Sequence, residues 1–280
     1  MQHGRPSRTA RGAAGHRAAH QLLEQGSVFR DCLARDILGA EGCAEADERA
    51  RDRSLRPLRL LIAARSRFAE EALAGAVARG LRQAVVLGAG LDTFALRNPH
   101  AALGLRLFEV DHPATQDWKR RRLFEAGLPV PPSLALVPLD FERESLAERL
   151  ATNGFDAGAA AFFFWLGVVP YLTRDSVMTT LRFIAEIPGG EVVFDYCEPL
   201  ENYPSERRGG VEKLIERTAA AGEPMIFFPQ PAGLARDLRA LGFEEVEDLD
   251  LAEISPRLLG GPRGLGRRAG PHFLRARRRG

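Results

Sequence analysis

Short runs of strand-forming residues alternate with helical segments through the middle of the chain, and this alternation limits the fold more than any other feature. The strand-like runs lie at residues 84–87, 106–110, 134–138, 160–166 and 191–196. The helical segments between them lie at residues 117–127, 144–151 and 174–187. Strands that alternate with helices predict a parallel sheet with helices on both faces.

Two further helical segments, at 211–222 and 231–242, precede two last strand candidates at 243–251 and 272–278. The sequence therefore predicts an α/β fold with a seven-stranded, mostly parallel Rossmann-like sheet whose last strand is antiparallel. The segment near 199–230 is long for a connection, so we expect an insertion there that covers the substrate.

The first 80 residues have a different pattern, which is helical from about residue 9 to residue 79. Thr9 is a candidate cap for the first helix, and residues 58–77 form a long amphipathic helix that ends at Gly80. We therefore expect an N-terminal helical cap at 1–80 and a Rossmann-like domain at 81–280.

The charge balance argues against binding to nucleic acid or to a membrane surface. The 280 residues carry 39 basic and 37 acidic side chains, a net charge of +2. The C-terminal stretch 263–280 is strongly basic and keeps an RNA-binding hypothesis open, although such ends are commonly solvated tails. No aromatic stacking platform accompanies it.

Other classes of protein are also disfavoured. The three cysteines, Cys32, Cys43 and Cys197, are widely spaced and predict neither a metal site nor a disulfide frame. The longest apolar run, AAAFFFWLGVV, suits a buried strand, and the N-terminal stretch lacks the apolar segment of a secretory signal. We expect a soluble cytoplasmic protein. The oligomeric state is not predicted.

The first strand leads into a glycine turn, QAVVLGAGLDT, in which Gly88, Ala89 and Gly90 let backbone approach a ligand. Thr93 stands where a dinucleotide-binding loop carries its third glycine. That departure is awkward beneath a pyrophosphate, but it is compatible with a nucleoside that carries an amino acid, such as S-adenosylmethionine. Asp92 either lines this site or caps the next helix.

Acidic residues follow the next two strands. Glu109 and Asp111 share one face of FEVD, about 20 residues past the glycines, where a carboxylate accepts both ribose hydroxyls. Asp140 with Phe141 is placed to hold an adenine. The alternative is that Asp140 caps the next helix and Phe141 belongs to the core.

With these residues, the chain resembles the leucine carboxyl methyltransferase-like family, most closely its bacterial branch of S-adenosylmethionine-dependent O-methyltransferases. The matching stretches include TARGAAGHRAA, VVLGAGLDTFALR, FEVDHPATQDWKRRRL, WLGVVPYLTRDSV and AAAGEP. The resemblance covers Thr9 to about Phe243 and implies S-adenosylmethionine as cofactor and methyl transfer as activity.

The resemblance also implies roles for individual residues. Arg65 would pair with the methionyl carboxylate, Gly88 would contact the cofactor through its backbone, and Asp111 would bind the ribose. Asp140 and Phe141 would hold the adenine. In relatives that methylate protein phosphatases, a glutamate stands at the position of Leu166. This departure favours a small-molecule acceptor, and it also keeps open a protein that binds the cofactor without transferring methyl.

The remaining site predictions concern the acceptor. The resemblance implies that Tyr171 orients the acceptor and places Arg17 near a carboxylate of the cofactor or substrate. The alternatives are that Tyr171 packs at a junction between strand and helix and that Arg17, like Arg65, is a surface arginine of an amphipathic helix. Tyr196 and Glu198 end the fifth strand and are candidates for the acceptor pocket. An NAD-dependent oxidoreductase is the alternative enzyme, but the chain has no Tyr-x-x-x-Lys motif. No metal is predicted.

Overall fold

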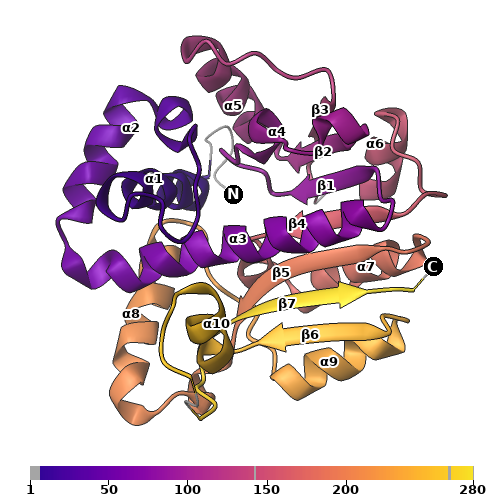
Figure 1. The fold of residues 1–280 in the computed structure, drawn as a ribbon. Coiled ribbons are helices and arrows are strands. Elements are labelled where there is room, and N and C mark those ends of the chain that lie inside the picture. Colours follow the sequence, from indigo (N-terminus) through magenta and orange to yellow (C-terminus); the bar gives the residue numbers. More distant parts are fainter. Residues whose placement is uncertain (1–6, 142, 264–265, 280) are drawn as a thin grey trace.

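A seven-stranded sheet with the strand order β3-β2-β1-β4-β5-β7-β6 runs through the molecule (Figure 1). The structure, a computed structural model, describes residues 7–141, 143–263 and 266–279. Residues 1–6 of the predicted cap and residues 264, 265 and 280 of the basic C-terminal stretch lie outside this range. The strands are β1 (Gln83–Leu87), β2 (Arg106–Asp111), β3 (Leu134–Pro138), β4 (Ala161–Trp165), β5 (Glu191–Cys197), β6 (Glu245–Leu249) and β7 (Pro271–Arg277).

The pairing of the strands confirms the predicted mostly parallel sheet. β1 pairs in parallel with both β2 and β4, while β7 is antiparallel to β5 and to β6. Because the chain moves outward from β1 in one direction and then returns to β4, the order reverses between these two strands. In open α/β sheets, ligands bind outside the carboxyl ends of the strands at such a point.

The helices separate the strands nearly as predicted. They are α1 (Arg8–Leu23), α2 (Ala34–Ala50), α3 (Arg56–Ala78), α4 (Phe94–Arg97), α5 (Pro113–Glu125), α6 (Leu146–Thr152), α7 (Arg174–Glu186), α8 (Ser205–Ala220), α9 (Pro231–Ala240) and α10 (Leu251–Leu258). Four short 3-10 helices complete the elements: η1 (Arg53–Leu55), η2 (Ala101–Leu103), η3 (Val169–Tyr171) and η4 (Leu200–Asn202).

Two local predictions were wrong. Ser7, not Thr9, caps α1, because its side chain accepts a hydrogen bond from the backbone N of Ala10 at 3.1 Å. The helix α10 was not predicted, since the strand candidate was extended to residue 251. A capping box starts this helix: Asp250 accepts from the backbone of Glu253, whose side chain accepts from the backbone of Asp250.

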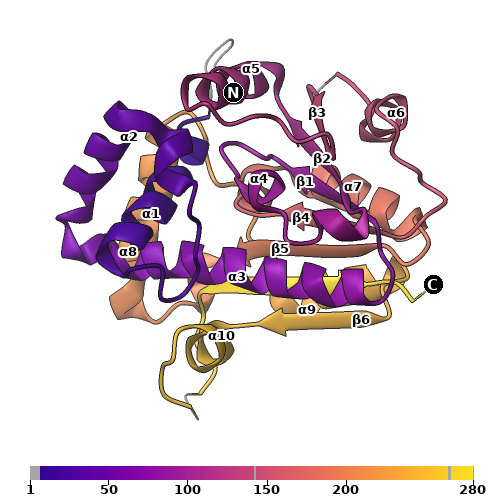
Figure 2. The same ribbon diagram turned by 45° about the horizontal axis from the view of Figure 1, so that its top comes forward.

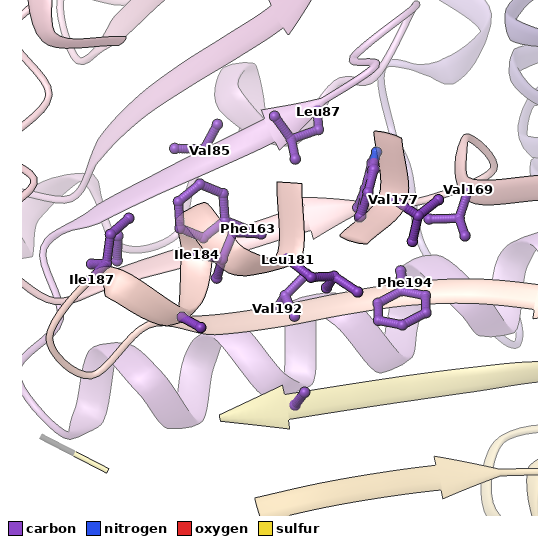
Figure 3. Packing of buried hydrophobic residues seen from close by; sticks show 14 of the residues in the cluster. Val85, Leu87, Phe163, Val169, Val177, Leu181, Ile184, Ile187, Val192 and Phe194 are labelled. Carbon is purple, nitrogen blue, oxygen red and sulfur yellow. The ribbon is translucent and has the colours of Figure 1, made fainter. Parts of the chain in front are cut away.

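The two faces of the sheet are covered by different helices. Helix α7 packs Val177, Leu181 and Ile184 against apolar residues of β1, β4 and β5 (Figure 3). Helix α3 packs Phe68 and Leu73 on the opposite face. Since α3 shares a core with the sheet, a division of the chain at residue 80 stays a prediction.

Helices α1 and α2 lie beyond one end of the sheet, together with α8 (Figures 1 and 2). This is the carboxyl end of β1, because a Cβ on Gly90 would lie 2.9 Å from the Cβ of Ala10 in α1. The N-terminal helices therefore cover the edge at which an α/β sheet binds its ligand.

Candidate functional site

The glycine turn after β1 has a backbone that other residues adopt only with strain. Gly88 and Gly90 have φ angles of +68° and +49°. A Cβ on Gly88 would collide with the side chain of Val168, and one on Gly90 would crowd Ala10. Both glycines thus let other parts of the chain approach the turn closely.

Asp111, at the end of β2, holds the turn in place. Its Oδ2 accepts a hydrogen bond from the backbone N of Gly90 at 2.6 Å, and its Oδ1 accepts from the backbone N of His112 at 2.7 Å. Burial raises the pKa of Asp111, although these two hydrogen bonds act in the opposite direction. The side chain of His112 caps α5 by accepting from the backbone N of Ala114.

A buried ion pair lies beside the glycine turn and contacts Asp92, which follows it. The Nζ of Lys119 pairs with Glu109 and also donates to the carbonyl oxygen of Asp92 at 2.7 Å. Burial raises the pKa of Glu109 to about 6, while Lys119 opposes that change. The Asp92 carboxylate accepts from the backbone N of Phe94 at 2.7 Å. Thr93, not Asp92, is the N-cap of α4, so Asp92 makes a local contact just before the helix, and its role toward a ligand stays a prediction.

Arg65 reaches from α3 to the loop after β4. Its Nη1 donates to Asp195 Oδ2 at 2.8 Å, and Asp195 Oδ1 accepts from the backbone N of Gly167 at 2.6 Å. A Cβ on Gly167 would lie 2.9 Å from Arg65 Nη1, so only glycine leaves room for the guanidinium. The Nε of Arg65 is buried and has no hydrogen-bond partner among the described residues. A buried donor without a partner is costly, which is consistent with a site that receives an acceptor from a ligand.

Thr93 connects the glycine loop to the helical cap. Its Oγ1 donates to Asp31 Oδ1 at 2.6 Å and accepts from Arg97 Nε at 3.0 Å. Arg17 donates to Asp31 Oδ2 at 3.0 Å and to the carbonyl oxygen of Leu91 at 2.6 Å. These contacts give Thr93 a role that a third glycine cannot perform. Arg17 is thereby hydrogen-bonded to the glycine loop at Leu91, and its role toward a substrate stays a prediction.

We expect Thr93→Gly to lower the free energy of unfolding by about 2 kcal/mol without creating an NAD site, because a hydrogen bond to a buried carboxylate is lost and the backbone gains freedom. Urea denaturation and calorimetry with NAD measure the two effects. Thr93→Ser, which keeps the hydroxyl, is the matched control. NAD binding by Thr93→Gly would show that the threonine excludes the dinucleotide.

The predicted adenine residues lie after β3. Phe141 is 44% exposed and therefore does not belong to the core, which excludes that alternative. Ser145, not Asp140, caps α6. Leu166 is half-buried and packs against the cluster that also contains Phe164. An exposed aromatic ring at the ligand-binding edge is suited to cover a base.

Tyr171 lies at the end of η3, close to Arg65. Burial raises its pKa to about 12, with Arg65 opposing the change and Asp195 and Glu223 adding to it. The hydroxyl is therefore protonated at neutral pH and is suited to donate a hydrogen bond, not to remove a proton. Glu223 reaches the same region and accepts hydrogen bonds from the backbone N of Arg8 and Thr9 at 3.2 and 2.9 Å. It thus joins the predicted cover to the first turn of α1.

The side chains of Tyr196 and Glu198 contact residues of β6 and β7. The hydroxyl of Tyr196 donates to Asp248 at 2.6 Å, and its ring stacks on His272. Glu198 lies 3.0 Å from His272 Nε2, and Asp248 lies 2.8 Å from His272 Nδ1. Because the polar atoms of both residues already have partners within the protein, acceptor binding by them stays a prediction.

The buried position of His272 makes stability depend on pH. Burial lowers its pKa, but Asp248 and Glu198 outweigh this effect and raise the pKa above 6.5. The charged histidine therefore contributes stability fully below pH 6.5, and the contribution is lost as pH rises through the folded-state pKa.

We expect His272→Gln to lower the free energy of unfolding by roughly 3 kcal/mol at about pH 5.5, because Asp248 and Glu198 lose the buried cation that they share, and by less at about pH 9. Urea denaturation at both pH values measures this, with His100→Gln as control. A loss that is equal at both values would contradict a charged His272.

Most arginines of the basic C-terminal stretch are paired with carboxylates. Arg275 pairs with Glu191 at 2.6 Å, Arg277 with Glu245 at 3.3 Å, and Arg267 with Glu198 at 2.9 Å. This pairing removes much of the free positive charge on which the RNA-binding hypothesis depended.

The described residues also limit other classes of site. In them, no three His, Cys, Asp or Glu side chains gather as metal ligands do. No helix in the described ranges has the length and apolar character needed to cross a membrane.

The sheet order and the ligand-binding edge together define the class: the arrangement is that of S-adenosylmethionine-dependent methyltransferases. The family model for leucine carboxyl methyltransferase matches residues 10–185. The chain therefore belongs to the leucine carboxyl methyltransferase family, whose cofactor is S-adenosylmethionine.

Two bacterial relatives support the assignment to this family. YktD of Bacillus subtilis (strain 168), a proposed S-adenosyl-L-methionine-dependent methyltransferase, is 39% identical over 58% of this chain and 54% of its own length. The chain thus spans about half of that relative. SCO7813 of Streptomyces coelicolor, with the same proposed activity, is 35% identical over 77% of this chain and 73% of its own.

A DUF574 family protein of Streptomyces avermitilis shares the fold at a TM-score of 0.56 and 16% identity, with 98% of each chain covered. That similarity supports the α/β fold predicted from the alternating strands and helices.

The site residues fit this cofactor. Arg65 has a buried nitrogen without a partner among the described residues, which suits a carboxylate. At Gly88 and Gly90 the space that a side chain would take is filled by Val168 and Ala10, so the turn offers a ligand its backbone. Asp111 ends β2, the strand next to β1, and Phe141 follows β3, the strand beyond it, where a ribose and a base would lie.

Several residues of this site escaped the sequence-based prediction. Asp31, Gly167 and Lys119 make contacts that no spacing in the sequence reveals, because their partners are 62, 28 and 10 residues away. For Lys119 a signal existed, since it is one of two lysines in an arginine-rich chain.

Proposed function

We propose that this protein transfers the methyl group of S-adenosylmethionine to an oxygen, a carboxylate or a hydroxyl, of a small-molecule acceptor. The observation that carries the proposal is the meeting of the glycine turn, Asp111 and the unpartnered Nε of Arg65 at the carboxyl end of the sheet. Each of these groups suits a different part of a nucleoside that carries an amino acid. The NAD-dependent alternative is set aside, since the chain belongs to a methyltransferase family.

The residues would hold the cofactor in an extended arrangement. Arg65 would bind the methionyl carboxylate with its free Nε, while Asp195 keeps the guanidinium oriented. Asp111 would accept hydrogen bonds from the ribose hydroxyls in addition to its backbone bonds. The backbone of Gly88, Ala89 and Gly90 would lie against the cofactor. Asp140, Phe141 and Leu166 would surround the adenine and the neighbouring part of the nucleoside.

Methyl transfer is an in-line displacement: a lone pair of the acceptor oxygen forms the new O–C bond, and the electron pair of the broken C–S bond stays on sulfur. The protein must chiefly align the reacting atoms and exclude water. A carboxylate acceptor needs no base, whereas a hydroxyl releases its proton to solvent or to a base. Tyr171, protonated at neutral pH, would orient the acceptor by donating a hydrogen bond.

Oxygen transfer and a small acceptor are supported by two features. The family is named for methylation of a carboxyl group. The cover formed by α1, α2 and the segment from η4 to Glu223 lies over the site, and Glu223 fixes it to α1. Such a cover suits a small acceptor that must be shielded from water.

We expect Tyr171→Phe to lower turnover roughly 10-fold while the affinity for S-adenosylhomocysteine stays unchanged, because the ring is kept and only the donor is lost. Turnover is measured with methyl-labelled S-adenosylmethionine over a panel of carboxylic acids and phenols. Tyr203→Phe, which changes a buried tyrosine of the cover, is the control.

Calorimetry with S-adenosylmethionine, S-adenosylhomocysteine and NAD completes the test. We expect the two adenosyl compounds to bind and NAD not to bind. Binding without transfer to any acid or phenol would identify a cofactor-binding protein that has lost the reaction, and binding of NAD alone would overturn the proposal.

A further inference from the structure

A cavity lies between α1, α2 and the start of α3, and the proposed methyl-transfer site does not include it. Its lining comes from Gly12 and His16 of α1, Glu45 and Arg49 of α2, and Arg59 of α3, among others. The volume is about 30 Å³.

The cavity is on the side of α1 that faces away from the glycine turn. Ala10 lies against Gly90 and Arg17 donates to the carbonyl of Leu91, so these two residues, seven positions apart, mark the face toward the turn. At about 3.6 residues per turn, Gly12 and His16 lie on the opposite face. One helix therefore separates the cavity from the cofactor edge.

The lining carries more positive than negative charge. It holds Arg11, Arg49 and Arg59 but only one carboxylate, Glu45. Arg59 pairs with Glu24 at 2.6 Å and Arg11 with Glu45 at 3.0 Å. Arg49 forms no ion pair with any residue that the structure describes, so its charge is not balanced.

His16 supplies a neutral polar group to the same cavity. Burial and then the charges of Arg59, Arg49, Arg217 and Arg65 lower its pKa to about 4. Within the described ranges its ring makes no hydrogen bond, so one ring N–H is free to donate. A neutral imidazole and the guanidinium of Arg49 are the partners that an anion requires.

The size of the cavity selects among anions. A water molecule needs about 10–15 Å³ of cavity volume, so the cavity has room for about two water molecules or one planar carboxylate. Arg49 and Glu45 are exposed and Arg59 is only 3% exposed, which means that a ligand enters past the first two. We propose that this cavity binds the carboxylate group of a small anionic ligand, held by Arg49 and His16 above the buried Arg59.

Occupation of this site would influence the cofactor edge through α1. The opposite face of the same helix holds the glycine turn, so a ligand that restrains α1 favours one position of Ala10 and Arg17. Such a coupling is reciprocal: the cofactor changes the affinity for the carboxylate by the same factor. The proposal itself concerns α1, α2 and α3 and holds whether or not methyl transfer occurs.

The test uses acetate as the probe and the full-length chain with ¹⁵N-labelled histidine, followed by NMR at constant ionic strength with chloride as reference. The His16 resonance, assigned with His16→Gln, is expected to shift saturably with acetate. Arg49→Gln should weaken acetate binding roughly 10-fold, the loss of one charge-assisted contact. Arg51→Gln, which removes an exposed arginine two residues away, should leave it unchanged.

A second variant tests the cavity without removing a charged side chain. A Cβ on Gly12 would meet nothing within 4 Å, so the space beside this lining residue is open, and Gly12→Leu is designed to fill it. We expect it to abolish acetate binding while S-adenosylhomocysteine still binds, and this binding also shows that the variant is folded. No saturable shift in the wild type, or equal binding by Gly12→Leu, would overturn the site. Tighter binding of inorganic phosphate than of acetate would overturn the assignment to a carboxylate.

Discussion

Asp111→Ala is expected to weaken S-adenosylhomocysteine binding by at least roughly 100-fold, since hydrogen bonds to a charged group are worth about 1.5–3 kcal/mol each. The proposed ribose hydroxyls lose their acceptor. In addition, the backbone N of Gly90 loses its partner at 2.6 Å, so the glycine turn is no longer held in its binding conformation. Isothermal titration calorimetry measures the affinity.

The matched control is Asp117→Ala, which removes an exposed carboxylate from α5 six residues further along the chain. It should bind as the wild type does. Circular dichroism checks that both variants are folded. An Asp111→Ala variant that is folded and keeps wild-type affinity would remove this residue from the site.

Arg65→Gln is expected to weaken S-adenosylhomocysteine binding roughly 10- to 100-fold. The reason is that the proposed, partly buried pair between the guanidinium and the amino-acid carboxylate of the ligand is lost. Binding of 5′-methylthioadenosine, which has the same nucleoside but no amino-acid carboxylate, should change little. The ratio of the two affinities, measured by calorimetry, therefore reports on the carboxylate alone.

Arg67→Gln is the control for this prediction, since Arg67 lies on the same helix and makes an exposed pair with Glu71 and a long hydrogen bond, 3.5 Å, to the carbonyl oxygen of Leu258. If Arg65→Gln weakened both ligands equally, Arg65 would act by shaping the loop at Gly167 instead of by binding the carboxylate. Unchanged affinity for both ligands would contradict the assignment altogether.

The strands, most helices and the ligand-binding edge could be predicted from the sequence because their signals are local. QAVVL and LALVP are apolar runs with strand-forming residues, and the turn after QAVVL has glycines at its two strained positions. The helix α10 was also signalled locally, by Asp250 and Glu253 three residues apart, but the acidic run before it was extended too far.

Contacts between distant segments could not be predicted in this way. Thr93 looked like a defect in a dinucleotide loop, and its partner Asp31 is 62 residues away. The stacking of Tyr196 on His272 arises because β7 returns antiparallel beside β5 and pairs these two residues. The cavity beside His16 exists only where three helices meet.

The sequence by itself determined the order of the elements, the position of the glycine turn and the acidic residue that follows β2, because periodicity and turn chemistry act over a few neighbouring residues. The tertiary structure alone decided which polar groups are already paired and which remain available to a ligand. The Asp92 carboxylate bonds the backbone of Phe94, Arg17 bonds the carbonyl oxygen of Leu91, and one buried nitrogen of Arg65 has no partner among the described residues. Pairing depends on distances and burial that arise only when segments remote in the chain are packed together.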